Sequence, residues 1–515
     1  MNRRQGTMRR KALLAACFLL LAAVAQPRYV HGAEARKVRE ATVAGAFYPG
    51  NPDKLAAMMD AMLATADPAP VEGKILAAVA PHAGYPYSGP VAAYTYAALR
   101  GHSYKRVVVL APSHFVSFDF TSVYDGDAYT TPLGAVPVDK KFAYALTQLD
   151  PSIQLSGKGH TPTAAGGEHA LEVQLPWLQH VLGDFTLVPI VMGNQSYESS
   201  RALGVALAKL IAQEHGAAGE TLVLASSDLS HYHPYDEAVQ IDSKTLAALS
   251  AWNYYSMARN FESRIWEACG GAPIVAAMIY AERMGARQAT VLKYANSGDA
   301  AGDKSRVVGY GAALFVNASA KAAADPPFAL TQEEKKELLA IARHSVESAV
   351  GAHQEFEPAP SANPRLNREF GAFVTLTRHG QLRGCIGYTS AIKPLYLTVR
   401  DTATLAALRD PRFAAVEPGE LASIEYEVSV LSPLRRVMDA HEIEMGRDGL
   451  LIKNGGHEGL LLPQVPGEFG WDRTAFLEHT CAKAGLPRDC WQSEATDIFR
   501  FTADVFHEEK LEEKK

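Results

Sequence analysis

The chain contains 515 residues, of which 48% are hydrophobic and 21% are charged, and these proportions are ordinary for a globular protein. A single hydrophobic core stops growing near ~250–300 residues, so we expect two or more domains. A nucleic-acid-binding protein usually shows a basic patch, and the formal net charge of -6 gives no reason to expect such a partner.

The first 35 residues have the three-part pattern of a secretory signal peptide. A basic start extends to Lys11, an apolar run follows from Ala12 to Ala25, and small residues around Ala33 offer cleavage points. The apolar run is shorter than the ~20 residues that a membrane-spanning helix needs. We therefore predict that residues 1–35 are a signal and that the mature protein is exported, periplasmic or extracellular, without a stable membrane span. The alternative is a protein anchored in the membrane through an uncleaved signal.

Removal of this signal leaves four cysteines, namely Cys269, Cys385, Cys481 and Cys490. Four cysteines are too few for a disulfide scaffold in a chain of this length. Cys481 and Cys490 are the only pair close in sequence, and the sequence leaves open whether they approach closely enough to form a disulfide.

The part of the chain between the signal and residue 316 alternates apolar runs with helix-like stretches. The apolar runs are Ile75–Ala80, Val107–Ala111, Phe185–Val191 and Leu222–Ala225, and the helix-like stretches include Pro90–Leu99, Leu171–Leu182 and Ser199–Gln213. Continuous apolar strands separated by helices predict an α/β domain with a largely parallel sheet that is covered by helices on both faces.

Polar residues follow three of these predicted strands. His82 comes after the first strand, His114 after the second and Asp228 after the fourth. The carboxyl ends of parallel strands meet at one edge of a sheet, where such proteins hold their sites. We therefore expect the imidazoles of His82 and His114 to meet.

Two converging imidazoles are candidate metal ligands, because a metal needs several lone-pair donors in one place. Cys269, as a thiolate, would supply a soft and negatively charged third ligand. Asp228 and His231 are candidates for further ligands, for groups that orient the ligands, or for general acid/base groups. The alternative is structural, because a free cysteine often behaves as a small buried hydrophobe and a histidine after a strand often caps a loop. The spacing matches neither a zinc finger nor a His-Glu-x-x-His helix.

The second half of the chain reads as a separate domain. Residues 317–327 are rich in Ala, Ser and Asp and are predicted to be a linker. Thr331 then opens a capped amphipathic helix, and strand-like alternation follows at Ala372–Thr377 and Glu425–Leu431. Helices and strands are mixed less regularly than in the first half, which predicts an α+β domain. Residues 508–515 are expected to be a charged, solvated tail.

The stretch from Leu382 to Gly387 contains Arg383, Cys385 and two glycines that allow close backbone approach. It is either a binding groove that exposes Arg383 and Cys385 or a tightly packed turn. We favour the packed turn for Cys385.

Several motifs of the first half, taken together, are specific for one family. They are Ala44–Pro49, Pro81–Tyr85, Leu110–His114, Glu168–Glu172, Ser226–His231, Cys269-Gly270, Tyr294–Asp299 and Val308–Tyr310. On these motifs the region 38–316 resembles the Memo family, whose sheet flanked by helices is similar to the fold of class III extradiol dioxygenases.

The resemblance to the Memo family implies a metal site. His82, His114 and Cys269 match the family's metal-binding residues, with an iron or copper ion as the implied cofactor, and Asp228 and His231 match residues that line the same pocket. The cysteine departs from the dioxygenases, whose third ligand is a carboxylate, and this departure argues against ring cleavage.

The second half resembles the AMMECR family over residues 328–507. The motifs are Leu382–Gly387, Asp410–Phe413, Glu427–Ser432, Gly459–Gln464, Trp471 and Lys483–Leu486. The family's fold is a two-part α+β unit, and the resemblance assigns it no biochemical role.

The fused order resembles the AmmeMemoRadiSam system, in which Memo-like and AMMECR-like proteins accompany a radical SAM protein. The resemblance implies a separately encoded radical SAM partner, because this chain has no Cys-x-x-x-Cys-x-x-Cys motif of its own. Since radical SAM chemistry is normally cytoplasmic, the predicted export signal requires either an exported partner or no such pairing for this chain.

The leading hypothesis is a metal-binding protein with redox or oxygen-linked chemistry in its first domain, in which Asp228 and His231 steer protons or an unidentified small-molecule substrate. One alternative is a non-catalytic metal-handling or assembly partner of a radical SAM protein. A second alternative is a dioxygenase-like enzyme that acts on a small aromatic compound. Whether the protein is an enzyme stays open at this point.

Overall fold

The structure is a computed structural model that describes residues 36–508 except 165, 215–219, 287, 318–328 and 390. The predicted signal at 1–35, the predicted linker beyond Asn317 and the predicted tail beyond Glu508 lie outside the described residues. Within the described part of the chain, every helix is too short or too polar to span a bilayer.

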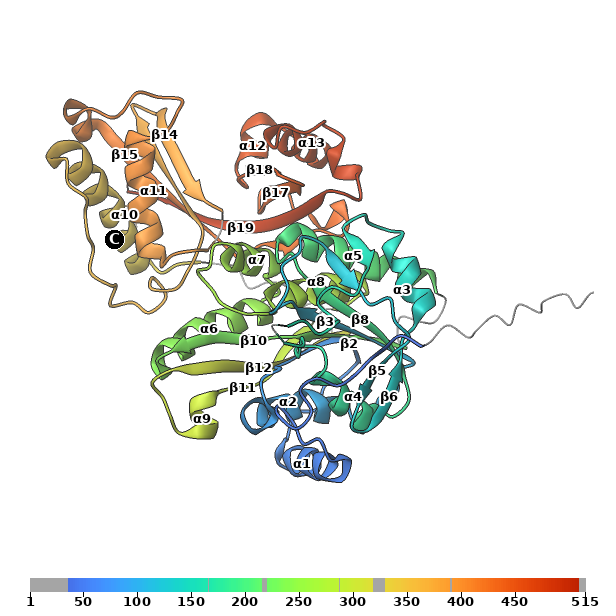
Figure 1. The fold of residues 1–515 in the computed structure, drawn as a ribbon. Coiled ribbons are helices and arrows are strands. Elements are labelled where there is room, and N and C mark those ends of the chain that lie inside the picture. The colour runs from blue at the N-terminus through green and yellow to red at the C-terminus, as the bar shows by residue number, and fades with distance from the viewer. Residues whose placement is uncertain are drawn as a thin grey trace, which may run out of the picture. The chain divides into compact units, whose positions relative to one another are not determined.

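The first domain is built on a nine-stranded mixed sheet in the order β10-β12-β2-β9-β3-β8-β4-β7, with β11 paired to β12 (Figure 1). Its centre is the parallel array of β2 (Lys74–Ala80), β9 (Thr221–Ser226), β3 (Arg106–Pro112) and β8 (Thr186–Met192), which confirms the four predicted strands. The flanking strands are β4 (Thr121–Val123), β7 (Ile153–Leu155), β10 (Asp228–His233), β11 (Gln288–Asn296) and β12 (Val307–Asn317).

The flanking strands make the sheet less parallel than its centre. β12 pairs antiparallel with β2, β10 and β11, and β4 pairs antiparallel with β8. A separate three-stranded sheet contains β1 (Val38–Arg39), β5 (Ala128–Thr131) and β6 (Gly134–Pro137).

Two hydrophobic cores cover the two faces of the central strands. Along β2, Leu76 and Val79 pack into one core, whereas Ile75 and Ala78 pack into the other. Residues of α5 (Tyr197–Gln213) and α8 (Gly271–Arg283) belong to the first core, and residues of α2 (Tyr85–Leu99) and α4 (Gln174–Leu182) belong to the second. Burial on both faces explains why these strands are continuously apolar, as the α/β prediction requires. The other helices of this domain are α1 (Pro52–Thr65), α3 (Lys140–Thr147), α6 (Tyr235–Ser250), α7 (Tyr254–Glu262) and α9 (Ser297–Ala301).

Helix α2 begins five residues before the predicted start at Pro90. Pro86 lies at the first positions of the helix, where its missing N–H costs no hydrogen bond, and Pro90 lies inside the helix. The prediction was wrong at this boundary because Pro90 was taken as the start of the helix.

The second domain contains a seven-stranded sheet in the order β14-β13-β15-β19-β17-β18, with β16 paired to β19, and its pairs are antiparallel. The capping box predicted at Thr331 is present, because the Thr331 hydroxyl accepts from the N–H of Glu334 and the Glu334 carboxylate accepts from the N–H of Thr331. The mixture of helices with an antiparallel sheet confirms the α+β class.

The elements of the second domain have these bounds: α10 (Gln332–Glu347), β13 (Ala372–Arg378), β14 (Gln381–Tyr388), α11 (Leu395–Leu408), β15 (Ile424–Leu431), β16 (Arg435–Arg436), β17 (Asp448–Asn454), β18 (His457–Leu461), α12 (Val465–Phe469), α13 (Arg473–Lys483) and β19 (Asp497–His507). Short stretches of π or 3-10 helix occur at Ser348–Ala352, Pro418–Ser423, Ala440–Glu442 and Cys490–Gln492.

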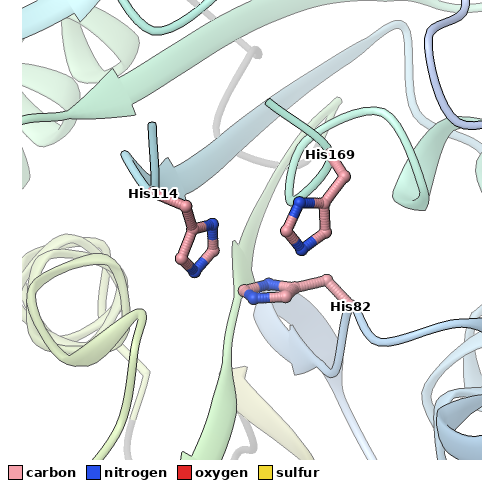
Figure 2. A group of neighbouring side chains, drawn as sticks. All are labelled: His82, His114 and His169. Atoms are coloured by element: carbon pink, nitrogen blue, oxygen red, sulfur yellow. The ribbon is translucent and has the colours of Figure 1, made fainter. Parts of the chain in front are cut away.

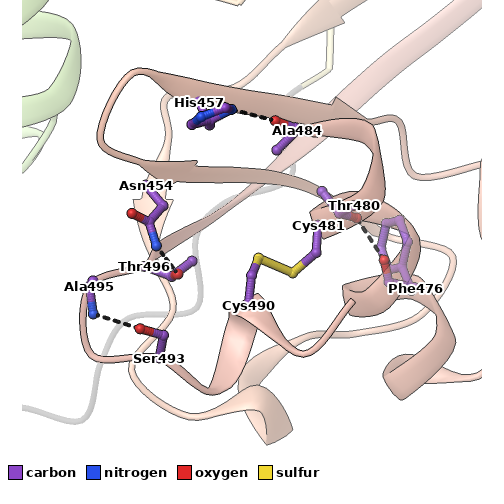
Figure 3. Close-up of a disulfide and its surroundings, with 10 residues drawn as sticks. All are labelled: Asn454, His457, Phe476, Thr480, Cys481, Ala484, Cys490, Ser493, Ala495 and Thr496. Carbon is purple, nitrogen blue, oxygen red and sulfur yellow. Dashed lines mark hydrogen bonds between the residues drawn. A yellow bond between two sulfur atoms is a disulfide. The ribbon is translucent and has the colours of Figure 1, made fainter. Parts of the chain in front are cut away.

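Cys481 and Cys490 form a disulfide with their Cα atoms 5.9 Å apart (Figure 3). The bond joins the last turn of α13 to the short helical turn at Cys490–Gln492. The structure thus settles the pairing that the sequence left open.

The glycine-rich stretch around Cys385 is part of strand β14. A Cβ atom added to Gly384 would lie 2.1 Å from the carbonyl oxygen of Ala406 in α11, so only glycine lets the helix approach the strand this closely. The backbone N–H of Cys385 donates to the Asp410 carboxylate, and the Arg383 guanidinium pairs with Glu420. Cys385 is half-buried, and burial raises the pKa of its thiol. The packed interpretation of this motif therefore fits better than an open groove, although the packed element is a strand rather than a turn.

Replacing Gly384 by Ala should lower the free energy of unfolding by on the order of 1–3 kcal/mol, because the added methyl group must displace the backbone of α11. Gly419→Ala is the matched control, since nothing lies within 4 Å of a Cβ added there. Denaturant titration of the two variants compares the changes. Equal stability of the two variants would show that α11 moves away from β14 without cost.

Candidate metal centre

The carboxyl ends of three central strands bring the predicted residues together. Strand β9 pairs in parallel with both β2 and β3, and Ala80 at the end of β2 lies opposite Ser226 at the end of β9. His82 follows β2, His114 follows β3, and Asp228 follows β9 by two residues. The expected meeting of His82 and His114 is found, with ring centroids 5.2 Å apart.

A third imidazole, that of His169, completes this group (Figure 2). The ring of His169 stacks on that of His114 at 4.9 Å with an interplanar angle of 14°, and it lies edge-on to His82 at 5.5 Å. One ring nitrogen from each of the three histidines lies within 4.8 Å of the other two. His82 is buried, His169 is half-buried and His114 is the most accessible of the three.

Ser226 determines which nitrogen of His82 carries the proton. The Ser226 hydroxyl donates its one hydrogen to the carbonyl oxygen of Ala170 at 2.5 Å, and its oxygen accepts from the Gln174 amide at 2.8 Å. The contact of 2.9 Å between the Ser226 hydroxyl and His82 Nδ1 must therefore be donated by the imidazole. His82 consequently holds its proton on Nδ1 and presents a bare Nε2 to the centre of the group.

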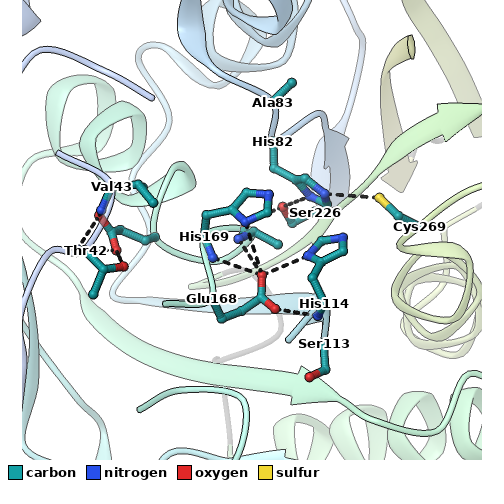
Figure 4. A network of polar contacts seen from close by, with 12 residues as sticks. Thr42, Val43, His82, Ala83, Ser113, His114, Glu168, His169, Ser226 and Cys269 are labelled. Carbon is teal, nitrogen blue, oxygen red and sulfur yellow. Dashed lines mark hydrogen bonds and ion pairs between the residues drawn. The ribbon is translucent and has the colours of Figure 1, made fainter. Parts of the chain in front are cut away.

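Glu168 has the same effect on His114 (Figure 4). Its carboxylate accepts from His114 Nδ1 at 2.9 Å and from the backbone N–H of His114 at 2.6 Å. It also accepts from the backbone N–H groups of His169 and Ala170. Burial works to raise the pKa of Glu168, but these hydrogen bonds outweigh burial and lower the pKa overall. An ionised Glu168 thus holds the His114 proton on Nδ1 and leaves Nε2 free.

Cys269 reaches the group from the side of His82. Its Sγ lies 3.1 Å from His82 Nε2 and accepts from the backbone N–H of Asp228 at 3.2 Å. Gly270 makes this position accessible, because a Cβ there would lie 2.3 Å from the carbonyl oxygen of Ser226. Burial, and then the charge of Asp228, raise the pKa of the Cys269 thiol well above its usual range.

Asp228 is buried beside His82. One carboxylate oxygen accepts from the backbone N–H of His82 at 2.7 Å, and the other lies 4.0 Å from His82 Nε2. Burial raises the pKa of Asp228 to about 7, so its carboxyl group exchanges a proton near neutral pH. The second oxygen faces the imidazoles and is placed to exchange that proton with a group bound among them.

His231 is not part of the group formed by His82, His114 and His169. It belongs to β10, which the sequence did not predict, and a register shift on either side of His231 interrupts the pairing of β10 with β12. His231 Nδ1 donates to the carbonyl oxygen of Leu229 at 2.8 Å, and burial lowers the pKa of the imidazole. His231 is therefore a neutral proton acceptor near the group but is not among the three converging histidines.

The sequence predictions did not include His169 among the site residues. His169 follows no predicted strand and lies in the turn before α4, which starts at Gln174 rather than at the predicted Leu171. Its signal in the sequence is the motif Glu168-His169, in which one residue positions His114 and the next adds an imidazole.

The donor set suits a borderline metal ion. Neutral imidazole nitrogens together with a cysteine sulfur are ligands for iron, copper or zinc rather than for calcium or magnesium. Two of the imidazoles have their outer nitrogen occupied by a protein acceptor, as metal-binding histidines almost always do. The residues present thus fit the ion that the family resemblance implies.

Comparisons with known proteins match both halves of the chain. A family model described as Memo-like protein matches residues 39–314, and one described as AMMECR1 matches residues 339–506. A MEMO1 family protein of Methanopyrus kandleri is 37% identical over 290 residues, which cover 54% of this chain and 98% of that protein. A protein of Thermococcus onnurineus is 47% identical over 182 residues, which cover 33% of this chain and 89% of that protein. The crystal structure of an uncharacterized protein from Pyrococcus horikoshii is 41% identical and covers 35% of this chain and 95% of that chain, with a TM-score of 0.34.

Asp228 should make the stability of the metal-free protein depend on pH. An aspartate in an unfolded chain has a pKa near ~3.9, whereas in the folded protein the pKa of Asp228 is about 7. Between these values the folded protein holds a proton that the unfolded chain has released. The contribution of Asp228 to the free energy of unfolding therefore falls by up to about 1.4 kcal/mol per unit as the pH rises from about 4 to about 7.

Asp228→Asn should remove this decline, so the variant should gain stability relative to the wild type across that interval and keep the gain above it. Denaturant midpoints of the two metal-free proteins, measured in steps of pH, test the expectation. A stability difference that does not change with pH would mean that Asp228 titrates in the folded protein as it does in water.

Proposed function

Because the chain belongs to the Memo family and joins a Memo domain to an AMMECR1 domain, we propose that it is a metal-binding protein whose first domain holds an iron or copper ion. His82, His114 and Cys269 are the proposed ligands. The observation that carries the proposal is the position of His82, whose ring lies 5.2 Å from that of His114 and whose Nε2 lies 3.1 Å from the Cys269 sulfur. The Nδ1 protons of both histidines are already donated to protein acceptors, which leaves their Nε2 lone pairs for the ion.

The proposed activity is redox or oxygen-linked chemistry, for which a bound iron or copper ion would supply one-electron steps. The protein's own part is to move protons. Asp228 exchanges a proton near neutral pH at the oxygen that faces the imidazoles, and neutral His231 accepts one farther out. Asp228 is thus the proposed acid/base group, and His231 would relay protons toward solvent or position a substrate.

Ring cleavage of an aromatic substrate is the less favoured alternative. The facial site of non-haem iron oxygenases uses two histidines and one carboxylate, whereas here the third predicted ligand is the Cys269 sulfur. The carboxyl group of Asp228 lies beside His82, but it is engaged by the backbone N–H of His82, and burial raises its pKa to about 7.

An open depression of about 580 Å³ lies in the first domain. It is lined by Ser117, Phe118, Asp119, Lys158, Gly193, Asn194 and Gln195. The Gln195 amide donates to the carbonyl oxygen of Cys269 at 3.1 Å, so this depression borders the ligand loop. We propose it as the place where a small polar substrate approaches, with the AMMECR1 domain binding a substrate or a separately encoded radical SAM partner.

We further propose that the mature protein is exported, with residues 1–35 as its signal. The disulfide between Cys481 and Cys490 supports this, because disulfides persist in oxidising compartments and are rare in the cytosol. Export also places the two free thiols, Cys269 and Cys385, where oxidants are available, and burial protects both by raising their pKa.

Metal content tests the proposed ligands. His82→Ala and Cys269→Ser should each weaken binding of the native metal by roughly 10–100-fold or more, because each removes a ligand rather than an outer partner. His441→Ala is the control, since His441 is exposed and its side chain is paired with Asp439. Elemental analysis of the mature protein, with both of its domains, gives the metal content.

Unchanged metal content in both variants would contradict the proposed ligand set. Oxygen consumption by the reduced, metal-loaded protein separates the functions. No consumption with any catechol excludes the ring-cleaving alternative, and a tightly bound metal without any turnover favours the non-catalytic metal-handling role.

Export predicts the oxidation state of the cysteines. The mature protein recovered from the extracytoplasmic compartment should contain one disulfide and two free thiols, and its first residue should lie near position 35. Alkylation before and after reduction, followed by mass spectrometry, counts the thiols and identifies the N-terminus. Five free thiols, with Cys17 retained, and an intact Met1 would show that the protein remains in the cytosol.

A further inference from the structure

His169 differs from its neighbours in one respect: its ring has no committed hydrogen bond. In the described part of the chain, His82 Nδ1 donates to Ser226, His114 Nδ1 donates to Glu168 and His231 Nδ1 donates to Leu229. The nearest polar contact of the His169 ring is Nδ1 to a Glu168 oxygen at 3.7 Å, which is longer than a hydrogen bond.

Neighbouring rings hold the His169 ring in place but give its nitrogens no hydrogen bond. The ring packs against Phe47 at 4.6 Å and Phe115 at 6.1 Å and stacks on His114. The His169 side chain is 16% exposed, and its ring nitrogens have no protein hydrogen bond among the described residues. A polar ring held in place without such a partner calls for an explanation.

The position of the ring supplies that explanation. One nitrogen of His169 lies within 4.8 Å of the ligand nitrogens of both His82 and His114. An ion with metal–nitrogen bonds of about 2.0–2.1 Å holds such nitrogens roughly 3.3 Å apart, so the rings would rotate to bring all three nitrogens onto one ion.

We propose that His169 is an additional ligand of the ion held by His82 and His114, so that the ion carries three imidazoles. This inference rests on the proposed function, because it requires an ion at His82 and His114. Cys269, whose Sγ lies 3.1 Å from His82 Nε2, would then be the fourth ligand, and three nitrogens with one sulfur are a donor set that a four-coordinate ion accepts.

Glu168 couples the two histidines of this face. The same carboxylate oxygen accepts from His114 Nδ1 and from the backbone N–H of His169. One ionised side chain therefore sets both the proton position of His114 and the backbone position of His169. Three imidazoles and one thiolate favour a borderline divalent ion. They disfavour a hard ion such as calcium or magnesium, which requires oxygen ligands.

The test counts the imidazoles bound to the ion. Full-length protein labelled with ¹⁵N at histidine is titrated with Zn²⁺, which is diamagnetic and has no redox chemistry, and two-dimensional ¹H–¹⁵N spectra of the rings are recorded. We expect one nitrogen from each of His82, His114 and His169 to move to the position of a metal-bound imidazole. In the His169→Gln variant only the nitrogens of His82 and His114 should move, and the Zn²⁺ affinity should fall by about tenfold or more.

His233→Gln is the matched control, because His233 lies in the neighbouring strand β10 and is bound by Glu237 and Glu267. This variant should leave three zinc-bound imidazoles. Two zinc-bound imidazoles in the wild-type protein would overturn the proposal for His169 while leaving the ion at His82 and His114. Absence of any zinc-bound imidazole would overturn the proposed metal centre itself, so the two failures are distinguishable.

Discussion

The parallel pairing of β2, β9 and β3 is the constraint on which the rest of the candidate centre depends. Because β9 lies between the other two strands in matched register, positions far apart in the chain leave the sheet side by side. Both faces of these strands are buried in separate cores, so a one-residue slip would move each apolar side chain into the wrong core. The positions of His82, His114 and Asp228 are therefore set by the most deeply packed part of the domain rather than by their own loops.

A second layer of polar contacts converts this placement into a usable ligand set. Arg39 of β1 is buried, pairs with Glu172 and donates to the carbonyl oxygen of Glu168. Glu172 in turn accepts from the backbone of Thr42 and the hydroxyl of Tyr48. A buried ion pair of this kind stabilises a fold only when its remaining hydrogen bonds are satisfied, as they are here. Arg39 and Glu172 thus fix one side of the turn that carries Glu168 and His169. The other side of this turn faces the imidazoles.

Sequence patterns predict the strands that are buried on both faces. They do not predict the elements whose position depends on irregular backbone geometry. The four central strands are predicted because they are buried on both faces and hence continuously apolar. Strand β10 is missed because its register is interrupted and it carries polar residues from Asp228 to His233. His169 is missed for a related reason, since it reaches the centre from an irregular turn and no periodicity marks it.

The electrostatics of the pocket explain why a cation and the thiol belong together. Asp228 and Cys269 are both acids whose ionised forms are disfavoured by burial, and the charge of Asp228 further raises the pKa of Cys269. The groups that face them from β2, β3 and the Glu168 turn are imidazoles rather than lysine or arginine. A divalent cation between these groups reverses the balance, because it favours the thiolate and the carboxylate at once. An ion bound as proposed would therefore release protons from these groups as it loads.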